Sequence, residues 1–230
     1  MTKLSIILPT LNAAPELAAC LRAITASEPA GVEIVVSDGG SSDGTPGQAR
    51  AAGATFVTGP QGRGGQLHRG AEAAGGDWLL FLHADSRLPR HWHAIVQHHI
   101  TNDPTRAAAF RLGFRAAGFA PRLVAGWANL RSLLGLPYGD QGLLISASHY
   151  AAIGGYADIP LMEDVEIAAR LKGRLRLLPA IVTTGAGRYQ RQGWLRRGAR
   201  NLILVCRYKL GADPHRLARA YGASDPPAEN

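Results

Sequence analysis

The sequence predicts a single α/β domain in which helices cover both faces of a mainly parallel sheet. Apolar strand-like runs alternate with helix-like segments through the first hundred residues. No internal repeat or linker divides the 230 residues, and the apolar content of 46% is enough for one large core. Polar or glycine-rich segments follow each of the first four predicted strands, at the edge where such sheets bind ligands.

The predicted elements follow in order. Apolar runs bounded by turn residues indicate strands, and apolar residues at helical spacing indicate helices. In the first half we expect strands at 3–9, 32–38, 54–59 and 77–85, and helices at 16–24, 45–53 and 66–76. Gly53 is expected to end the second helix. In the second half we expect strands at 107–115, 142–147 and 175–184, and helices at 121–135, 160–173 and 193–211.

The positive charge is concentrated in the last quarter of the chain. From Arg170 onward there are 13 Lys and Arg against three acids, a balance of +10, whereas the chain as a whole carries +8. Such asymmetry suggests an anionic partner: nucleic acid, phospholipid or a phosphorylated ligand. Nucleic acid is the least favoured, because no recognition motif accompanies the charge.

The long basic helix at 193–211 has two interpretations. Its apolar side packs on the sheet and leaves the arginines in solvent or near phosphates, or it forms an amphipathic face lying on a membrane. We favour the first, because a sandwich of this size needs cover on both faces. A homodimer contact through the same helix is a third alternative.

Targeting and redox signals indicate a cytoplasmic protein. The first twelve residues make a poor signal peptide, and no apolar run is long enough to span a bilayer. Two cysteines, Cys20 and Cys206, allow at most one disulfide and form no CxxC pair. We expect contact with the inner face of the cell membrane only if the basic helix at 193–211 presents an amphipathic face to a membrane.

Two loops resemble ligand-binding turns. "DGGSSDGT" follows the second strand: Asp38 ends a buried run before Gly39, where a backbone can approach a flat ligand, while Asp43 or Thr45 suits a helix N-cap. "GPQGRGGQ" follows the third strand and fits neither a Walker A loop nor a dinucleotide fingerprint. It carries Arg63 and Gly64 into a helix N-terminus, which suits a diphosphate, with a plain surface loop as the alternative.

Histidines and carboxylates supply the remaining candidates. His83 and Asp85 end the fourth strand, and positions i and i+2 of an extended chain face the same side. Asp85 suits Mg²⁺ or Mn²⁺ shared with a diphosphate, whereas we favour a structural role for His83. The four histidines of "HWHAIVQHH" fit no tight zinc motif, and we expect them on a solvent-facing helix. Glu163 and Asp164 open a helix, where a carboxylate can act as a general base toward a hydroxyl.

Taken together, these segments resemble the family 2 glycosyltransferases, which are inverting enzymes of the type-A fold. The resemblance rests on "SIILPTLN", "EIVVSDGGSSDGT", "GRGGQLHRGAEAAGGDWLLFLHAD", "GDQGLLIS", "GGY" and "MEDVEIAARL", in family order over almost the whole chain. The subgroup it most resembles is the radical-SAM/selenodomain-associated or arsenosugar-biosynthesis transferases. It implies one αβα sandwich with a mostly parallel mixed sheet. Within that domain, about 1–100 would bind the nucleotide sugar, about 101–190 the acceptor, and about 191–230 would form basic helices.

The resemblance also assigns roles. Asp164 would be the catalytic base, with Glu163 its neighbour in the "ED" pair, and Asp85 the last residue of a metal-binding DxD motif whose first Asp is here His83. The implied donor-site residues are Pro9, Thr10, Asn12, Asp38, Gly39, Arg63, Gly64 and Ala84. The implied donor is a nucleoside diphosphate sugar, UDP-linked by preference, with Mg²⁺ or Mn²⁺ and a hydroxyl acceptor.

One sugar would be transferred per reaction, because the QxxRW motif of processive synthases is absent. Two alternatives stay open on the same fold: a sugar-phosphate nucleotidyltransferase, which should carry a basic Gly-rich loop after the first strand, and a non-catalytic sugar-nucleotide-binding protein.

Overall fold

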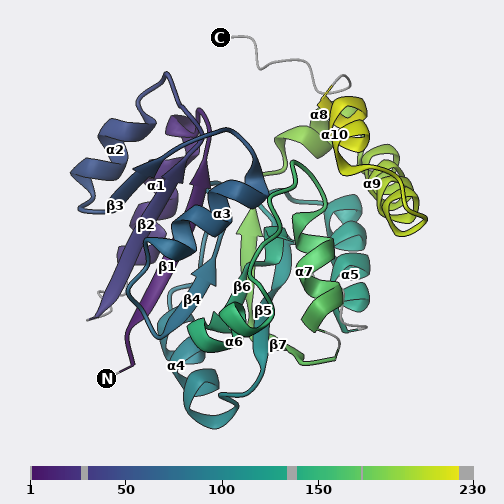
Figure 1. The fold of residues 1–230 in the computed structure, drawn as a ribbon. Helices are drawn as coiled ribbons and strands as arrows, with labels where there is room; N and C mark the ends of the chain where they lie inside the picture. The colour runs from purple at the N-terminus through teal and green to yellow at the C-terminus, as the bar shows by residue number, and fades with distance from the viewer. Residues whose placement is uncertain (1, 27–30, 134–138, 172, 223–230) are drawn as a thin grey trace.

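In a computed structural model, residues 2–26, 31–133, 139–171 and 173–222 can be described, and they form one α/β sandwich (Figure 1). Its seven-stranded sheet has the order β3-β2-β1-β4-β6-β5-β7. The strands are β1 (Leu4–Thr10), β2 (Val32–Asp38), β3 (Thr55–Thr58), β4 (Trp78–Phe81), β5 (Ala107–Phe114), β6 (Leu143–Ser146) and β7 (Leu175–Thr184). Strand β6 runs antiparallel to its neighbours β4 and β5, and the other pairs are parallel. The predicted fold class, a mostly parallel mixed sheet between helices, is confirmed.

Helices cover both faces of this sheet (Figure 1). They are α1 (Ala14–Thr25), α2 (Thr45–Ala51), α3 (Arg63–Glu72), α4 (Trp92–Asn102), α5 (Phe119–Leu133), α6 (Ala147–Ala152), α7 (Glu163–Leu171), α8 (Gly187–Gln192), α9 (Trp194–Lys209) and α10 (Pro214–Gly222), with a 3₁₀ turn η1 (Gly139–Gln141). Every predicted strand and helix is present; β2 and β7 have the predicted bounds, and the other elements have shifted ends. Positions 134, 135 and 172 of the predicted helices lie outside the described residues. Helices α6, α8 and α10 were not predicted as separate elements.

The alternation of β1 explains the two-sided core. Leu4, Ile6 and Leu8 point to one face and pack in a cluster with side chains of α1 and α4. Ile7 points to the other face and packs in a cluster with side chains of α3, α6 and α7. Because both faces of β1 are buried, its sequence is mostly apolar on both faces rather than alternating, with Ser5 and Thr10 as its buried polar residues.

The histidine-rich segment was only partly predicted. It is helical, as expected, and forms α4, but His99 is buried, with its Nε2 2.9 Å from the Arg106 carbonyl oxygen and its ring edge-on to Trp78. The expectation of a wholly solvent-facing histidine face was therefore wrong at His99. Among the described residues, no group of three or more His, Cys, Asp or Glu is placed to hold a metal.

The preferred interpretation of the long basic helix was only partly right. At the start of α9, Trp194 packs edge-on against Phe114 of β5, with 5.0 Å between the ring centroids. Farther along, α9 buries Leu204 and Val205 against the start of α7, in a small cluster separate from the sheet. Its Leu195, Leu202 and Ile203 side chains are exposed instead. Over the described residues, no helix is both long and apolar enough to cross a bilayer. Cys20 and Cys206 are both free, Cys20 buried and Cys206 exposed.

Candidate active site

Two cavities adjoin at the carboxyl edge of the parallel strands. The larger, about 760 Å³, is walled by the ends of β1 and β4 and by the loop into α3. The smaller, about 420 Å³, is walled by the start of α7, the end of β7 and helices α8 to α10. Both cavities are lined by Arg63, His83 and Asp85. Two ligands held in these spaces would therefore meet at those three side chains.

The predicted donor residues divide into two groups. Pro9, Thr10 and Ala84 line the larger cavity, together with Arg63. The other four, Asn12, Asp38, Gly39 and Gly64, line neither cavity.

Asp38 organises the loop after β2. Its Oδ1 accepts hydrogen bonds from Thr10 Oγ1 at 2.8 Å and Ser41 Oγ at 2.6 Å. Its Oδ2 accepts from the backbone N–H groups of Gly40 at 2.9 Å and Ser41 at 2.7 Å. Burial acts to raise the pKa of Asp38, but these hydrogen bonds outweigh it and lower that pKa overall. The carboxylate thus joins the ends of β1 and β2.

The neighbouring polar side chains extend this network. Asn12 has a φ of 48°, and its side-chain oxygen accepts from the Ser42 N–H at 3.0 Å. Asp43 accepts from the N–H groups of Ala14 and Thr45, so it serves the first turns of both α1 and α2. The residue at the N-cap position of α2 is Gly44, and the prediction of Asp43 or Thr45 there was wrong by one position.

Gln66 is buried and joins the ends of β1 and β2. Its amide nitrogen donates to the carbonyl oxygens of Thr10 at 2.6 Å and Ser37 at 3.1 Å. A Cβ on Gly39 would lie 3.1 Å from the Gln66 side chain, which accounts for a glycine there. A Cβ on Gly64 would lie 2.1 Å from the Ala157 carbonyl oxygen. The glycines at 39 and 64 therefore also serve packing.

Arg63 pairs with Glu163 across the site. Its Nη1 lies 3.2 Å from Glu163 Oε1, and Glu163 is buried. Burial raises the pKa of Glu163 to about 7 against the lowering effect of Arg63, while Glu163 raises the pKa of Arg63. Glu163 Oε2 is buried without a partner among the described residues. Arg63 nevertheless lines both cavities, so the same side chain remains in reach of a ligand.

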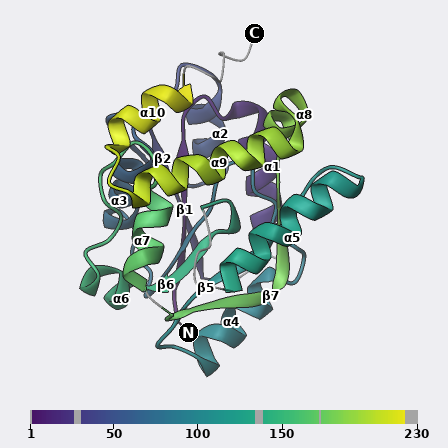
Figure 2. The same ribbon diagram turned by 90° about the vertical axis from the view of Figure 1, so that its right-hand side faces the viewer.

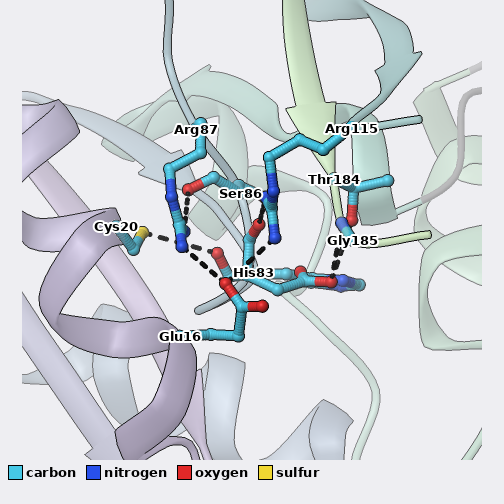
Figure 3. Close-up of polar contacts among 9 residues, drawn as sticks. Glu16, Cys20, His83, Ser86, Arg87, Arg115, Thr184 and Gly185 are labelled. Carbon is cyan, nitrogen blue, oxygen red and sulfur yellow. Dashed lines mark hydrogen bonds and ion pairs between the residues drawn. The ribbon is translucent and has the colours of Figure 1, made fainter. Parts of the chain in front are cut away.

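The segment from His83 to Asp85 forms a turn, not the extended end of β4. The strand ends at Phe81, and the Ser86 N–H donates to the His83 carbonyl at 3.0 Å. The i, i+2 argument for their common orientation was therefore wrong, although both side chains line both cavities. The Cys20 thiol lies 3.7 Å from the same carbonyl oxygen (Figure 3), and burial raises the pKa of Cys20 to about 12, which marks it as a packing residue.

Contacts with β7 fix this turn in place. Asp85 Oδ2 accepts from Thr184 Oγ1 at 2.9 Å and from the Gly185 N–H at 3.3 Å. Arg87 and Thr183 exchange backbone hydrogen bonds at 2.8 and 3.1 Å. We call these contacts the β4–β7 latch. Beside it, Glu16 pairs with Arg87 and Arg115 (Figure 3).

Asp164 and His83 lie on either side of Gly139. Asp164 Oδ2 accepts from the Gly139 N–H and Oδ1 from the Val165 N–H, both at 2.8 Å. A Cβ on residue 139 would lie 2.8 Å from His83 Nε2 and 3.5 Å from Asp164 Oδ2. A side chain at this position would be too close to His83, whereas its distance to Asp164 would be an ordinary contact. Asp164 lines the smaller cavity but not the larger one.

The donor atoms at the shared wall suit a divalent cation that is completed by a ligand. Within the described residues, hydrogen bonds reach only Oδ2 of the Asp85 carboxylate, which leaves Oδ1 its lone pairs. Burial and the Arg63 guanidinium lower the pKa of His83 to about 4, so its imidazole is neutral at pH 7 and able to coordinate. Two protein ligands are what Mg²⁺ or Mn²⁺ uses when phosphate oxygens supply the rest.

Sequence reasoning missed several residues of the smaller cavity. Asp140 lines it, and Asp140 Oδ1 is buried without a hydrogen-bond partner among the described residues. Burial raises the pKa of Asp140 to about 6; Arg131 opposes this and Asp164 adds to it. The only signal was its place in "GDQ". Glu16, Arg188 and Tyr221 line both cavities, and no local pattern marks them.

The site places this chain among the open α/β proteins with cavities at the carboxyl edge of the sheet, where such folds bind ligands, and sequence comparison specifies the class further. The family description "Glycosyl transferase family 2" matches residues 5–153, more than half of the chain. The chain therefore belongs to glycosyltransferase family 2. The predicted subgroup remains a prediction.

Curated relatives match over a shorter stretch. The PGL/p-HBAD biosynthesis glycosyltransferases of Mycobacterium bovis and Mycobacterium tuberculosis are 41% identical over 91 residues. The match covers 36% of this chain and 36% of each relative, so the chain aligns with about a third of their length.

Solved structures share the fold. Glucosyl-3-phosphoglycerate synthase from Mycobacterium tuberculosis, in complex with Mn²⁺, UDP and glucosyl-3-phosphoglycerate, has a TM-score of 0.55 at 21% identity and aligns over 80% of this chain and 70% of its own. S. aureus TarS in complex with UDP-GlcNAc has a TM-score of 0.58 at 13% identity over 80% and 58% of the two chains. Both likenesses concern the fold.

Proposed function

We propose that this protein transfers one sugar from a nucleoside diphosphate sugar, UDP-linked by preference, to a hydroxyl acceptor, with inversion at the anomeric carbon. The observation that carries the proposal is the pair of adjoining cavities with a common wall. The larger one takes the nucleotide at the ends of β1 and β4, and the smaller one takes the acceptor beside Asp164. Membership of family 2 and relatives solved with UDP or UDP-GlcNAc support a nucleotide-sugar donor.

Asp164 is the proposed general base. Its carboxylate is oriented by the Gly139 and Val165 N–H groups and lines only the acceptor cavity. It takes the proton of the acceptor hydroxyl while that oxygen attacks the anomeric carbon and the nucleoside diphosphate leaves from the opposite face. A single displacement of this kind inverts the centre and needs no covalent enzyme intermediate. Glu163, the other member of the acidic pair, accepts a hydrogen bond from Arg63 and positions that guanidinium.

Asp85, with His83 beside it, would hold Mg²⁺ or Mn²⁺. A divalent cation there would offset negative charge on the departing diphosphate. Arg63 faces the same wall and adds a fixed positive charge. Thr184 and Gly185 keep the Asp85 side chain in one orientation. The donor's glycosidic carbon would lie where the two cavities join.

Product analysis tests the reaction. The purified protein is incubated with a panel of nucleotide sugars and Mn²⁺. Slow hydrolysis of the donor is measured as the amount of nucleoside diphosphate released. In a parallel assay with added inorganic diphosphate, formation of nucleoside triphosphate and sugar phosphate would instead indicate a nucleotidyltransferase. Nucleotide binding without turnover would indicate a binding protein.

A matched pair of variants tests the metal. Asp85→Ala should weaken metal-dependent donor binding and abolish turnover, with the fold intact by circular dichroism. His83→Ala should have the smaller effect if its role is to shape the turn, and an equal loss would make it a ligand. Full turnover by Asp85→Ala in the presence of EDTA would rule out the metal role.

A further inference from the structure

Helix α5 turns its large apolar side chains outward. Phe119, Leu123, Trp127, Leu130 and Leu133 recur every three or four residues and are all exposed, from 48% to 80%. The residues that α5 buries are small: Pro121, Ala128 and Ser132. Single exposed apolar residues need no explanation, but a full stripe along four turns of one helix does.

Helix α9 repeats this arrangement beside it. Its outward stripe consists of Leu195, Ala199, Leu202, Ile203 and Cys206. The two helices pack against each other, and Trp127 of α5 and Leu202 of α9 border one small hollow, so the stripes are continuous. Figure 2 looks at this side of the molecule, where α9 crosses above α5. We call this surface the α5/α9 face.

The charged side chains that α5 and α9 themselves carry are all positive. Arg122, Arg196, Arg207 and Lys209 are exposed along its borders, and neither helix contains an Asp or Glu. A second copy of the chain would bring like charges together across a two-fold axis, which opposes dimerisation through this face. An apolar stripe bordered by lysine and arginine is the pattern of a helix that lies in the interface of an anionic bilayer.

We infer that the α5/α9 face docks on the surface of an anionic lipid bilayer, with the apolar stripes immersed and the basic residues at the phosphates. Asp140 lines both the hollow between the two helices and the proposed acceptor cavity, so docking would bring that cavity close to the lipid surface. The inference does not rest on the proposed reaction, because vesicle binding needs no donor and donor hydrolysis can be measured without vesicles.

Co-sedimentation of the full chain with vesicles tests the inference. We expect binding at low salt to phosphatidylcholine vesicles that contain phosphatidylglycerol, weak binding to phosphatidylcholine alone, and release at high salt. Arg196→Gln with Arg207→Gln should lower the partition coefficient more than about tenfold, since each basic residue near the surface contributes roughly a fivefold factor. Arg22→Gln, an exposed arginine on α1, should change nothing.

Tryptophan fluorescence gives a second readout. Trp78 and Trp92 are buried and Trp194 is partly covered, whereas Trp127 is 55% exposed on α5. Docking should therefore shift the emission to shorter wavelength through Trp127. Trp127→Phe should bind vesicles and lose the shift, while Trp127→Ser with Ile203→Ser should lose binding and retain its circular dichroism spectrum.

Two outcomes would overturn the inference. One is the lack of any binding to anionic vesicles at low salt. The other is a dimer by light scattering that the serine variants convert to monomer, which would make the α5/α9 face an interface between copies of the chain.

Discussion

Asp164 is held by two backbone N–H groups rather than by a charged partner, so its removal should alter chemistry more than structure. A general base contributes about 10²–10⁴-fold in rate. We expect Asp164→Asn to lower kcat by that order and to leave the donor Kd nearly unchanged, measured by transfer kinetics and nucleotide titration. Glu163→Gln is the matched comparison, and a larger kcat loss there would mean that the base is the other member of the pair.

Glu163 should make stability fall as pH rises. Its folded pKa of about 7 lies above its ordinary 4.5, so between these values the folded state holds a proton that the unfolded state has lost. Stability linked to that proton is present below pH 4.5 and is lost on the way to pH 7. Relative to Glu163→Gln, the wild type should lose up to about 3 kcal/mol across this window, at roughly 1.4 kcal/mol per pKa unit.

Urea unfolding of both proteins at several pH values measures this difference. The prediction fails if the difference in unfolding free energy between the two proteins does not change with pH, or if the wild type gains stability over the variant as pH rises. Either result would mean that the ion pair with Arg63 keeps Glu163 ionised in the folded state.

At the scale of elements, the start of α3 depends on close backbone packing. A Cβ on Gly64 would lie 2.1 Å from the Ala157 carbonyl oxygen, so Gly64→Ala must push apart α3 and the loop before α7. Overpacking of this kind costs about 1–3 kcal/mol, and the melting temperature should fall. Gly47→Ala in α2 is the control: a Cβ there meets nothing within 4 Å, and alanine should be neutral or stabilising. Equal melting temperatures for the two variants would contradict the prediction.

Short stretches of sequence predicted the helices and strands better than they predicted the contacts between them. The apolar runs of β1 and β2 and the amphipathic spacing of α7 are visible in short windows, because burial dictates them. Helix α10 could have been found from Asp213-Pro214, since the Asp213 side chain accepts from the His215 N–H in its first turn. Helices α6 and α8 have six residues each and little apolar periodicity.

The sequence predicted where in the fold the site residues lie, but not which of them contact one another. His83, Asp85, Arg63 and Asp164 line the cavities because strand ends and helix starts of this sheet meet at one edge. The pairing of Arg63 with Glu163 spans 100 residues and that of Asp85 with Thr184 spans 99, and no local rule links such partners. The exposure of the apolar stripe of α5 could not be predicted either. The spacing of apolar residues shows that a helix has an apolar face, but it does not show what covers that face.

At the scale of the whole molecule, the larger cavity brings the two halves of the sandwich together. Its walls come from β1 and α3 on one side and from Pro160, Leu161 and α8 on the other. A nucleotide there should stabilise the fold as one unit. At 100 times its Kd a ligand adds about 2.7 kcal/mol, and at about 2–4 °C per kcal/mol for this size UDP with Mn²⁺ should raise the melting temperature by roughly 5–10 °C. EDTA should remove part of that shift, and the same shift with uridine alone would contradict a diphosphate site.

The β4–β7 latch has a consequence for the timing of binding. Asp85 belongs to the floor of both cavities, and the hydrogen bonds that hold its side chain and the Arg87–Thr183 pair are all made within the protein, so we expect this part of the floor to form without a ligand. Ligand capture then involves no slow rearrangement of that floor, and any gating is left to the walls around Pro160 and α8. The Arg87 and Thr183 amides should exchange with deuterium as slowly in the free protein as in the nucleotide complex.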